Sequence, residues 1–573
     1  MISSTSGDRI GRRFGPVPAR RTRGTFFAAA SHPGSIEFEP IAATRHTQET
    51  QAEEDPAKGT AHVKTFYVTT AIDYVNARPH LGTAYEKIGA DCLARYKRLA
   101  GFDTYFLMGT DEHSTNVEKE ARRLGKTPED YSAEMAREFE KVWEKLHISY
   151  DQFIRTDLDI HKKAVSHLFE IIHKNGYIYQ GTYEGFYCAS CEEFVQEKDL
   201  EEGGLCPRHK EKAQWLEEKN YFFALSKFSD QLKKHIGAHP EFIQPDIRRN
   251  EILNVLEQGL EDVSVSRVGK TWGVPLPIAE GHVVYVWFDA LINYISALGY
   301  GGEDDAKFKK YWPADCHVIG KDITRFHCLI WPAMLMAAGL EIPKGVFGHG
   351  FVYSKGTKMS KTLGNILDPA VVADFFGDAD AVRYLLLREI AFDRDGDFTI
   401  EHAVMRYNAE LANELGNLFS RTLAMVQRYR GGKVPAWTPE AKTDYERLTA
   451  GVVDDYASHM DRLDFDEGLD ALWRSVQGAN RYIEEKKPWE LAKSADGKAL
   501  DDVLRTLLEV LRMSSILCIP VMPVKAAEMR VFLMLESDIA KLSLDEARRP
   551  GDAAWHEVGT PTPLFRKIEQ KVE

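Results

Sequence analysis

The spacing of apolar residues predicts alternating strands and helices from Thr65 onward. The run TFYVTTAI at Thr65 is β-branched and aromatic, which favours a buried strand. An amphipathic helix follows, with apolar residues at helical spacing at Leu81, Tyr85, Ile88, Cys92, Tyr96 and Leu99. Gly101 is suited to end that helix, and the run DTYFLMG from Asp103 predicts the next strand. This strand–helix–strand order predicts a parallel sheet that binds ligands at the carboxyl ends of its strands.

The rest of the chain changes character twice. Long charged helices are predicted at about 128–147 and 158–175, and residues 181–280 then carry Cys, Gly and turn residues between short strands. Strand-into-helix patterns return in VVYVWFDALINYISAL and CHVIGKDITRFHCLIWPAMLMAAG. Beyond about Phe398 the pattern is almost entirely helical. We therefore expect one α/β domain split by an insertion, followed by a helical domain.

Composition fits a water-soluble globular protein of several domains. The chain has 573 residues, of which 44% are apolar and 28% charged. At roughly 100–200 residues per domain this predicts about three or four domains. No apolar run reaches the length of about 18 residues that a membrane span needs, so no membrane association is expected. The formal net charge of −14 leaves a nucleic-acid partner open, because binding depends on where Lys and Arg cluster.

Residues 1–62 differ from the remainder. The first 35 residues contain six arginines, several Ser and Thr, and a single acid, Asp8. This composition fits an organellar transit peptide, and it equally fits a disordered tail produced by a start codon assigned too far upstream. In both cases the segment lies outside the fold. The expected location is the cytoplasm, or a mitochondrion or plastid if the segment is a transit peptide.

The stretch PHLGTAY places a histidine where a strand passes into a helix. The helix N-terminus after Pro79 offers free backbone N–H groups and a positive dipole end, which suit a phosphate. Gly82 would allow a flat ring or a phosphate to approach the backbone, and His80 could donate to phosphoryl oxygens as charge builds on them. The alternative is a histidine that only caps the helix, beside a structural glycine.

A second stretch, YSKGTKMSKTLGN, places Lys358 and Lys361 in a loop rich in Gly, Ser and Thr. Alone it could be a solvated basic loop. With PHLGTAY, in this order and in matching α/β context, it resembles the paired HIGH-type and KMSKS-type signatures of class I aminoacyl-tRNA synthetases. The matching residues are His80–Thr83 and Lys358–Thr362. Thr83 stands where the family commonly has a second histidine, and Thr362 keeps the hydroxyl of the usual serine.

Further segments are similar to the methionyl-tRNA synthetase family, and this resemblance runs from about Lys64 to the C-terminus. They are TTAIDYVNARPHLG, LMGTDEHS, YVWFDALINY, VIGKDITRFHCLIWPAML and GFVYSKGTKMSKTLGN. The resemblance implies a Rossmann-type catalytic domain and a pocket whose aromatic rings pack against the methionine thioether. The implied pocket residues are Ala71, Ile72, Tyr74, Trp287, Ala290, Leu291, Tyr294, Ile323 and His327. It also implies that Asp111 holds the α-amino group of methionine by an ion pair.

The same resemblance implies the nucleotide site. ATP, accompanied by Mg²⁺, would contact His80, Gly82, Thr83, Gly320, Lys321, Asp322, Lys358, Met359, Ser360 and Lys361. Of these, His80, Lys358 and Lys361 would be catalytic. Gly320 suits a close approach of the nucleotide to the backbone, whereas Lys321 could equally be a surface cation.

The cysteines indicate a metal site in the insertion. The segments CASC and CPRH supply two ligand pairs, and one tetrahedral Zn²⁺ held by Cys188, Cys191, Cys206 and His209 is the expected result. Such a knuckle replaces the core that a small insertion cannot build. A chance C-x-x-C or a redox pair are the alternatives. Seven cysteines in all, an odd number, do not fit a secreted disulfide framework.

The helical domain carries candidate RNA-binding residues. Asn417 and Arg421 lie four apart on one predicted helix, and Trp489 follows later. Such side chains can stack on and hydrogen-bond to unpaired bases, although an ordinary helix surface with a buried Trp has the same pattern. The resemblance implies that these three residues read a CAU anticodon.

We therefore expect a methionine–tRNA ligase that forms methionyl-adenylate from methionine and ATP. It would then charge the 3′-terminal adenosine of initiator and elongator tRNA(Met). The expected parts are a tail at 1–62, the catalytic domain at 63–180 and 283–350, the zinc-knuckle insertion at 181–282, the KMSKS-type loop and connecting segment at 351–397, and the anticodon-binding domain at 398–573. We expect a monomer, because no appended dimerisation module is recognisable.

Three rival functions were weighed against this hypothesis. A synthetase for Leu, Ile or Val usually carries a much larger insertion with an editing domain, for which about a hundred residues leave no room. A small nucleotidyltransferase of related fold would not need a helical tail of this length. A relative that binds tRNA without catalysis is disfavoured by the presence of His80, Asp111, Lys358 and Lys361, although Thr83 keeps it open.

Overall fold

The computed structural model describes residues 63–188, 190, 193–195, 197–208, 210–269, 271–359, 366–494, 497–551 and 555–569. Within them lies a sheet of seven parallel strands, as the βαβ pattern predicts. Its order is β2-β3-β1-β12-β13-β8, and β4 also pairs with β3. The strands are β1 (Thr65–Thr70), β2 (Asp73–Tyr74), β3 (Asp103–Asp111), β4 (Gln152–Arg155), β8 (Ile243–Gln244), β12 (Cys316–Gly320) and β13 (Val346–His349).

Side chains of the sheet alternate between two hydrophobic cores, one on each face. Tyr67 of β1 packs into a core with α4 (Asp159–Lys174) and α10 (Trp331–Ala338). Its neighbour Val68 packs into the other core, which contains α1 (Leu81–Leu99). The period of two along a strand produces this division. Both faces of the sheet are therefore buried, as expected for parallel strands.

The helix α1 ends where the sequence predicts. Ala100 is its C-cap, and Gly101 follows with φ of +87°, a conformation that favours glycine. Its N-terminus lies at the carboxyl edge of the sheet, next to the end of β1. This edge is the usual ligand-binding edge of a parallel sheet.

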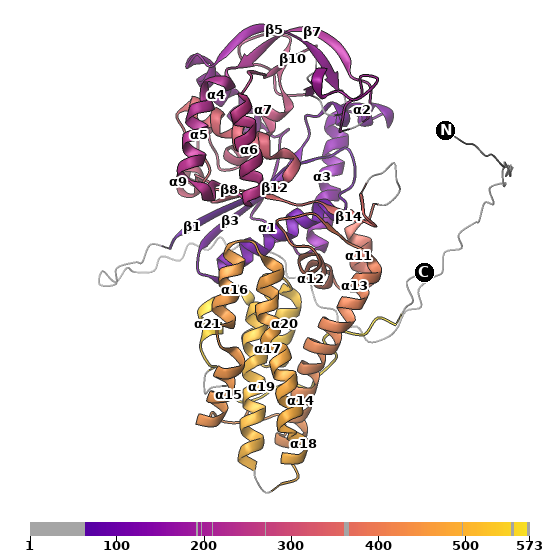
Figure 1. Ribbon diagram of the computed structural model, residues 1–573, viewed down its shortest axis with the longest axis vertical. Helices are drawn as coiled ribbons and strands as arrows, with labels where there is room; N and C mark the ends of the chain where they lie inside the picture. The colour runs from indigo at the N-terminus through magenta and orange to yellow at the C-terminus, as the bar shows by residue number, and fades with distance from the viewer. Residues whose placement is uncertain are drawn as a thin grey trace, which may run out of the picture. The chain divides into compact units, whose positions relative to one another are not determined.

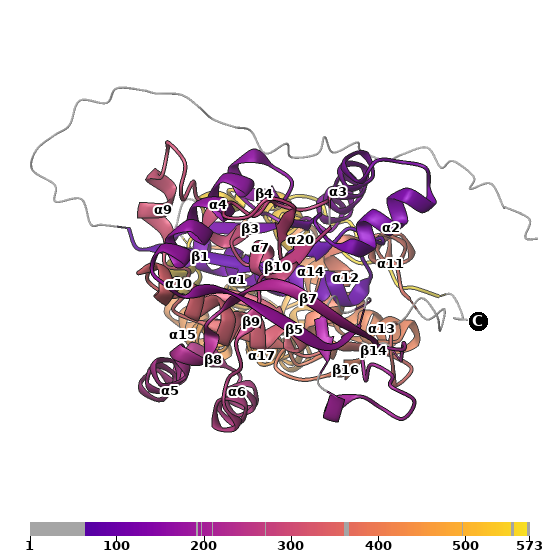
Figure 2. The same ribbon diagram turned by 90° about the horizontal axis from the view of Figure 1, so that it is seen from above.

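The insertion contains a separate antiparallel sheet. Its order is β6-β5-β7-β9, formed by β5 (Ile178–Cys188), β6 (Glu193–Val195), β7 (Gln214–Phe223) and β9 (Val263–Ser264). The long β5–β7 hairpin lies at the end of the α/β domain far from the helical domain (Figures 1 and 2). The segment from α5 (Ser229–Ala238) to α6 (Asp246–Gln258) also lies in the predicted insertion range but belongs to the main sheet, because β8 between these helices pairs with β13.

The chain after β16 (Gly396–Asp397) is helical, in agreement with the pattern beyond Phe398. A continuous helical segment runs through α13 (Ile400–Arg406), a π-helical stretch (Tyr407–Gly416) and α14 (Asn417–Arg430). The other main helices are α15 (Pro439–Thr449), α16 (Val452–Asp461), α17 (Phe465–Lys486), α18 (Pro488–Leu491), α19 (Gly497–Leu517) and α20 (Pro523–Phe532). They bundle beside α1 (Figure 1), and the core on the α1 face of the sheet continues into them.

A buried ion pair crosses this junction. Arg383 of α12 (Ala379–Glu389) lies 2.6 Å from Asp91 of α1, and both side chains are fully buried. The same guanidinium donates to the carbonyl oxygens of Pro520 and Val521 at 2.9 and 2.8 Å. The buried guanidinium of Arg383 thus joins α1 to the helical domain, in addition to the apolar packing. No helix in the described residues is long and apolar enough to cross a membrane.

Candidate functional site

His80 both caps α1 and faces the ligand-binding edge. Its Nδ1 accepts a hydrogen bond from the Thr83 backbone N–H at 3.1 Å, and the Thr83 hydroxyl lies 3.4 Å from the same nitrogen. Because Nδ1 is an acceptor, the proton of the neutral ring resides on Nε2. His80 can therefore cap the helix and also donate to a phosphate, since the capping hydrogen bond orients the ring and sets its tautomer.

Gly82 is required by the position of this imidazole. A Cβ at residue 82 would lie 3.0 Å from Cε1 and 3.1 Å from Nδ1 of His80. Any larger residue would push the ring away from its capping position. The sequence suggested that Gly82 admits a ligand, and the structure identifies the His80 ring as the group that approaches it.

The predicted methionine-binding residues gather around one hydrophobic cluster. Ala71, Leu291 and Tyr294 belong to its buried part, and Ile72, Tyr74, Trp287 and Ile323 pack against it. Tyr74 meets Trp287 edge-on with ring centroids 6.2 Å apart, and Trp287 stacks on Phe326 at 4.0 Å. Ala290 is also buried. The arrangement forms an aromatic wall suited to an apolar side chain.

A polar pair lies at one end of this wall. The Tyr294 hydroxyl is 2.7 Å from Nε2 of His327, and Nδ1 of His327 is 3.0 Å from the carbonyl oxygen of Ile323. Burial lowers the pKa of His327 to about 4, so the ring is neutral at physiological pH. Nδ1–H therefore donates a hydrogen bond to the carbonyl oxygen of Ile323, and Nε2 accepts a hydrogen bond from the Tyr294 hydroxyl. Both groups are fixed without introducing a charge.

Asp111 ends β3 beside this cluster, directly opposite Tyr74 in the pairing of β2 with β3. It is 3% exposed, and its carboxylate accepts from the backbone N–H of His113 at 3.2 Å. Nδ1 of His113 lies 2.6 Å from Asp289, whose other oxygen lies 2.8 Å from Nε2 of His161. Asp289 belongs to α7 (Val286–Ala290), the helix of Trp287 and Ala290. The Asp111 carboxylate and the aromatic wall are thus linked through His113 and Asp289.

The predicted nucleotide contacts Gly320, Lys321 and Asp322 lie where β12 ends. A Cβ on Gly320 would lie 2.7 Å from the Asp322 carboxylate, so this turn requires glycine. Lys321 is paired with Asp395 at 2.6 Å, and its ammonium lies 4.6 Å from the centre of the Phe351 ring. In this structure Lys321 is therefore a partner of Asp395 rather than an unpaired surface cation.

The KMSKS-type segment is only partly described. The antiparallel pair β14 (Val352–Ser354) and β15 (Thr357–Lys358) leads into it through a turn with positive φ at Lys355 and Gly356. Met359 is buried in the core that contains α1. Ser360, Lys361 and Thr362 lie outside the described residues, and the Lys358 side chain is not described.

Only two of the four predicted zinc ligands lie within the described residues. Cys188 at the end of β5 and Cys206 are 1% and 0% exposed and pack together with Val195. Cys191 and His209 lie outside the described residues. Among the residues the structure does describe, no three candidate ligands form a metal-binding group. The two described cysteines converge as one metal site would require, but the zinc knuckle itself is not shown.

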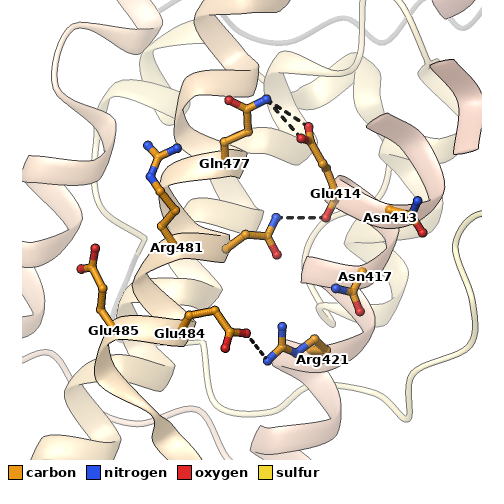
Figure 3. A pocket seen from close by; sticks show the side chains of 9 residues that line it. Asn413, Glu414, Asn417, Arg421, Gln477, Arg481, Glu484 and Glu485 are labelled. Atoms are coloured by element: carbon orange, nitrogen blue, oxygen red, sulfur yellow. Dashed lines mark hydrogen bonds and ion pairs between the residues drawn. The ribbon is translucent and has the colours of Figure 1, made fainter. Parts of the chain in front are cut away.

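The three predicted anticodon residues lie together in the helical domain. Asn417 and Arg421 of α14 line an open pocket of about 750 Å³, and the Arg421 guanidinium lies 6.0 Å from the centre of the Trp489 ring. Arg421 also pairs with Glu484 at 2.9 Å, and the two side chains point toward each other (Figure 3). Both remain partly exposed, which leaves them accessible to a ligand.

The opposite wall of this pocket was not predicted from the sequence. It is formed by Gln477, Asn480, Arg481, Glu484 and Glu485 of α17. Gln477 and Asn480 reach Glu414, with all three donor–acceptor distances at 3.2 Å (Figure 3). The available signal was a polar stripe at helical spacing on an amphipathic helix. Phe326, Asp289, His113 and His161 were also missed, because their roles depend on tertiary neighbours.

Comparisons with known proteins agree with this geometry. The family model described as "tRNA synthetases class I (M)" matches residues 66–215 and 208–423, and "Anticodon binding domain of methionyl tRNA ligase" matches residues 433–573. The chain belongs to the methionyl-tRNA synthetase family. The synthetase model spans both halves of the sheet and reaches Asn417 and Arg421.

Individual members of the methionyl-tRNA synthetase family are similar over most of their length. The methionine–tRNA ligase of Thermotoga maritima is 43% identical over 515 residues, which is 88% of this chain and 81% of the relative. That of Clostridium perfringens is 48% identical over 466 residues, 80% and 71% of the two chains. A structure of Mycobacterium tuberculosis methionyl-tRNA synthetase in complex with methionyl-adenylate is 40% identical with a TM-score of 0.84. It covers 88% of this chain and all of the other.

Proposed function

We infer that this protein is a methionine–tRNA ligase that consumes ATP. In the first step a methionine carboxylate oxygen bonds to the α-phosphorus of ATP, the bond from that phosphorus to the α,β-bridging oxygen breaks, pyrophosphate leaves, and methionyl-adenylate forms. The carboxylate is already a nucleophile, so this step needs no general base. Catalysis then consists of positioning and charge stabilisation. The observation that carries this conclusion is the placement of His80 and the aromatic wall at one edge of the sheet, in a chain of this family.

His80 stabilises charge that develops on the α-phosphate. The cap leaves the proton of the neutral ring on Nε2, which donates to a phosphoryl oxygen as its negative charge grows. The N-terminus of α1 adds backbone N–H groups and a positive dipole end. Thr83 contributes its backbone N–H to the His80 ring rather than a second imidazole. Lys358 and Lys361 supply positive charge toward the pyrophosphate, and Mg²⁺ accompanying ATP would offset the remaining phosphate charge.

Methionine binds between Asp111 and the aromatic wall. The buried carboxylate of Asp111 pairs with the α-ammonium group, which compensates the cost of burying either charge alone. Trp287 and Tyr74 then enclose the side chain, whose thioether packs favourably against ring edges. The neutral Tyr294–His327 pair offers the sulfur a polar environment without an unpaired charge. Together these groups select an uncharged side chain of this length.

In the second step a ribose hydroxyl of the 3′-terminal adenosine attacks the acyl carbon of methionyl-adenylate. An ester bond forms and AMP leaves. We propose that Asn417, Arg421 and Trp489 hold the unpaired bases of the CAU anticodon by hydrogen bonding and stacking. The substrates are then initiator and elongator tRNA(Met), and we propose that the enzyme acts as a monomer.

We also propose that one structural Zn²⁺ is held by Cys188, Cys191, Cys206 and His209. Support comes from the burial of Cys188 and Cys206 in one small cluster and from the ligand spacing of the sequence. Zinc bound there would hold the tip of the insertion, which has few other buried apolar residues.

Aminoacylation of a tRNA bearing a CAU anticodon tests the whole assignment. Arg421→Gln should lower kcat/KM for tRNA by about 10–100-fold, because it removes a cation and a base contact worth roughly 1–3 kcal/mol. Methionine-dependent ATP–pyrophosphate exchange should stay unchanged. Arg428→Gln, an exposed arginine on the same helix outside the pocket, is the control and should leave both reactions intact. Equal losses in both variants would contradict the assignment of the anticodon pocket.

A further inference from the structure

The ammonium group of Lys87 is completely buried on α1 beside the methionine pocket. It lies 2.8 Å from the carbonyl oxygen of Ala71, 2.6 Å from Glu86 and 2.9 Å from Asp73. The ammonium group donates hydrogen bonds to the Ala71 carbonyl and to Glu86, and it forms an ion pair with Asp73. Burial alone would lower the pKa of Lys87, but Asp73 and Glu86 outweigh it, so its pKa is raised and the group stays charged.

This cluster joins the segment that forms one wall of the methionine pocket to the helix that begins at His80. The pocket residues Ala71 and Tyr74 lie on the short connection from β1 through β2. Lys87 binds this connection by a hydrogen bond to the Ala71 carbonyl and an ion pair with Asp73. Lys87 itself lies two turns into α1, whose first turn holds the His80 ring. A displacement of the pocket wall would therefore shift the His80 end of α1. A displacement of that end would likewise shift the pocket wall.

The cluster also reaches the strand before the KMSKS-type segment. The second oxygen of Glu86 lies 3.1 Å from Nε2 of His349, the last residue of β13. Nδ1 of His349 lies 2.7 Å from the carbonyl oxygen of Gly350, from which the chain continues into β14. Three segments that contribute to the candidate active site thus meet at one buried charge.

Stability alone does not account for a lysine at this position. Ala84, Ile88 and Ala90 nearby on α1 are apolar, and apolar residues in place of Lys87, Glu86 and Asp73 together would avoid burying these charges. Replacing buried ion pairs by apolar residues is often neutral or stabilising. A lysine that ligates a main-chain carbonyl of the pocket wall instead defines where that wall lies.

We propose that Lys87 is a positioning residue that fixes the Ala71–Tyr74 wall relative to the His80 end of α1, so that methionine and ATP promote each other's binding. The assignment rests on the proposed function. Coupling of this kind is reciprocal, so it should be visible from either substrate. Lys87 touches neither substrate nor the reacting atoms.

Methionine-dependent ATP–pyrophosphate exchange with Lys87→Met tests the proposal. The variant keeps the length of the side chain and loses the charge and the bond to Ala71. We expect KM for methionine to rise about tenfold or more, as for loss of a charged hydrogen bond, while kcat changes by less than about threefold. In the wild type, saturating ATP should lower the KM for methionine, and this effect should disappear in the variant.

Lys87→Met leaves two buried carboxylates without their cation, so a matched variant is needed. Asp73→Asn/Lys87→Met removes one negative and one positive charge and thereby restores the charge balance of the cluster without restoring the bond to Ala71. We expect this double variant to fold, with its thermal midpoint near that of the wild type, and still to show the raised KM. A normal KM in the folded double variant would show that charge balance was the only role, and would overturn the proposal.

The remaining outcomes are also decisive. A double variant unable to fold would make Lys87 a folding residue and overturn its positioning role. Wild-type exchange that does not depend on methionine would overturn the proposed function itself. Methionine-dependent wild-type exchange, with unchanged KM in both variants, would overturn the role of Lys87 alone.

Discussion

His80 illustrates how one side chain meets a structural and a chemical demand together. The Thr83 N–H satisfies Nδ1, which would otherwise compete for the proton, and Gly82 leaves room for the ring. The family commonly has a second histidine where Thr83 stands, yet the shorter of the two Thr83 contacts with Nδ1 comes from the backbone N–H, which a histidine would also supply. The loss of that imidazole therefore leaves the orientation of His80 intact.

The Tyr294–His327 pair gives a prediction at the same scale. Tyr294→Phe would leave Nε2 of the buried His327 ring without its donor, which costs about 1–3 kcal/mol. We expect KM for methionine in pyrophosphate exchange to rise roughly tenfold. Tyr105→Phe is the control, because its hydroxyl bonds to Gln152 near the opposite end of β3 from Asp111. A similar rise in both variants would mean that the effect is not local to the pocket.

Residue roles were predictable where a local pattern carried them. His80, Gly82 and the Arg421–Asn417 pair could be selected because each lies in a short segment that resembles the family, and their roles stay predictions. Lys87 was not found, since a lysine on a helix normally faces solvent and the carbonyl that it binds lies sixteen residues away. The link of Glu86 to His349 spans 263 residues and leaves no sequence signal.

Among the elements, those with long periodic patterns were predicted well. The strand β1, the helix α1 and the strand β3 follow from their apolar spacing. The strand β8 was placed in the insertion range, because Ile243 and Gln244 are too few to show a period. Tertiary pairing with β13 draws them into the main sheet. The insertion that remains is the β5–β7 hairpin and its tip.

The hairpin tip carries the element-scale prediction. Purified wild type should contain about one Zn²⁺ per chain, and Cys188→Ala should lose it, because three ligands cannot complete a closed structural site. Metal analysis by mass spectrometry measures the content, and limited proteolysis should cut the tip of the variant faster. Cys518→Ala, at a buried cysteine in the helical domain, should retain the zinc. Zinc-free wild type with an intact hairpin would contradict the site.

For the whole molecule, the important feature is that α1 belongs to two domains at once. Its first turn holds His80, while Asp91 in its middle pairs with Arg95 and Arg383. Burial opposes ionisation of Asp91, but the two arginines outweigh it, so the pKa of Asp91 lies far below its ordinary value of 3.8. Through Arg383 the helical domain is thus anchored to the same helix that we propose binds the phosphates.

This anchor predicts a pH dependence of stability. A carboxyl whose pKa is lowered by folding stabilises the protein above its unfolded pKa near 4, and this contribution is lost as the pH falls below that value. Asp91→Asn should cost about 3–5 kcal/mol at pH 7, because it leaves the buried Arg383 guanidinium without its counter-ion. Its deficit relative to wild type, followed as the urea midpoint, should shrink below pH 4.

The control for this measurement is Asp461→Asn. Asp461 also joins the helical domain to α1, through Lys97 at 2.6 Å, but its side chain is 51% exposed. An exposed pair contributes at most about 1 kcal/mol, so this variant should stay close to wild type. Equal deficits for both variants, or a deficit for Asp91→Asn that persists unchanged at low pH, would contradict the account.

The central claim is that this chain activates methionine at the His80 edge of its sheet. The most direct test is amino-acid-dependent ATP–pyrophosphate exchange, measured for all twenty amino acids with the wild type and with His80→Ala. The account predicts exchange with methionine alone and a loss of about 100-fold or more in kcat for the variant, as for removal of a donor to developing negative charge. Exchange with leucine, isoleucine or valine, or full activity without His80, would contradict it.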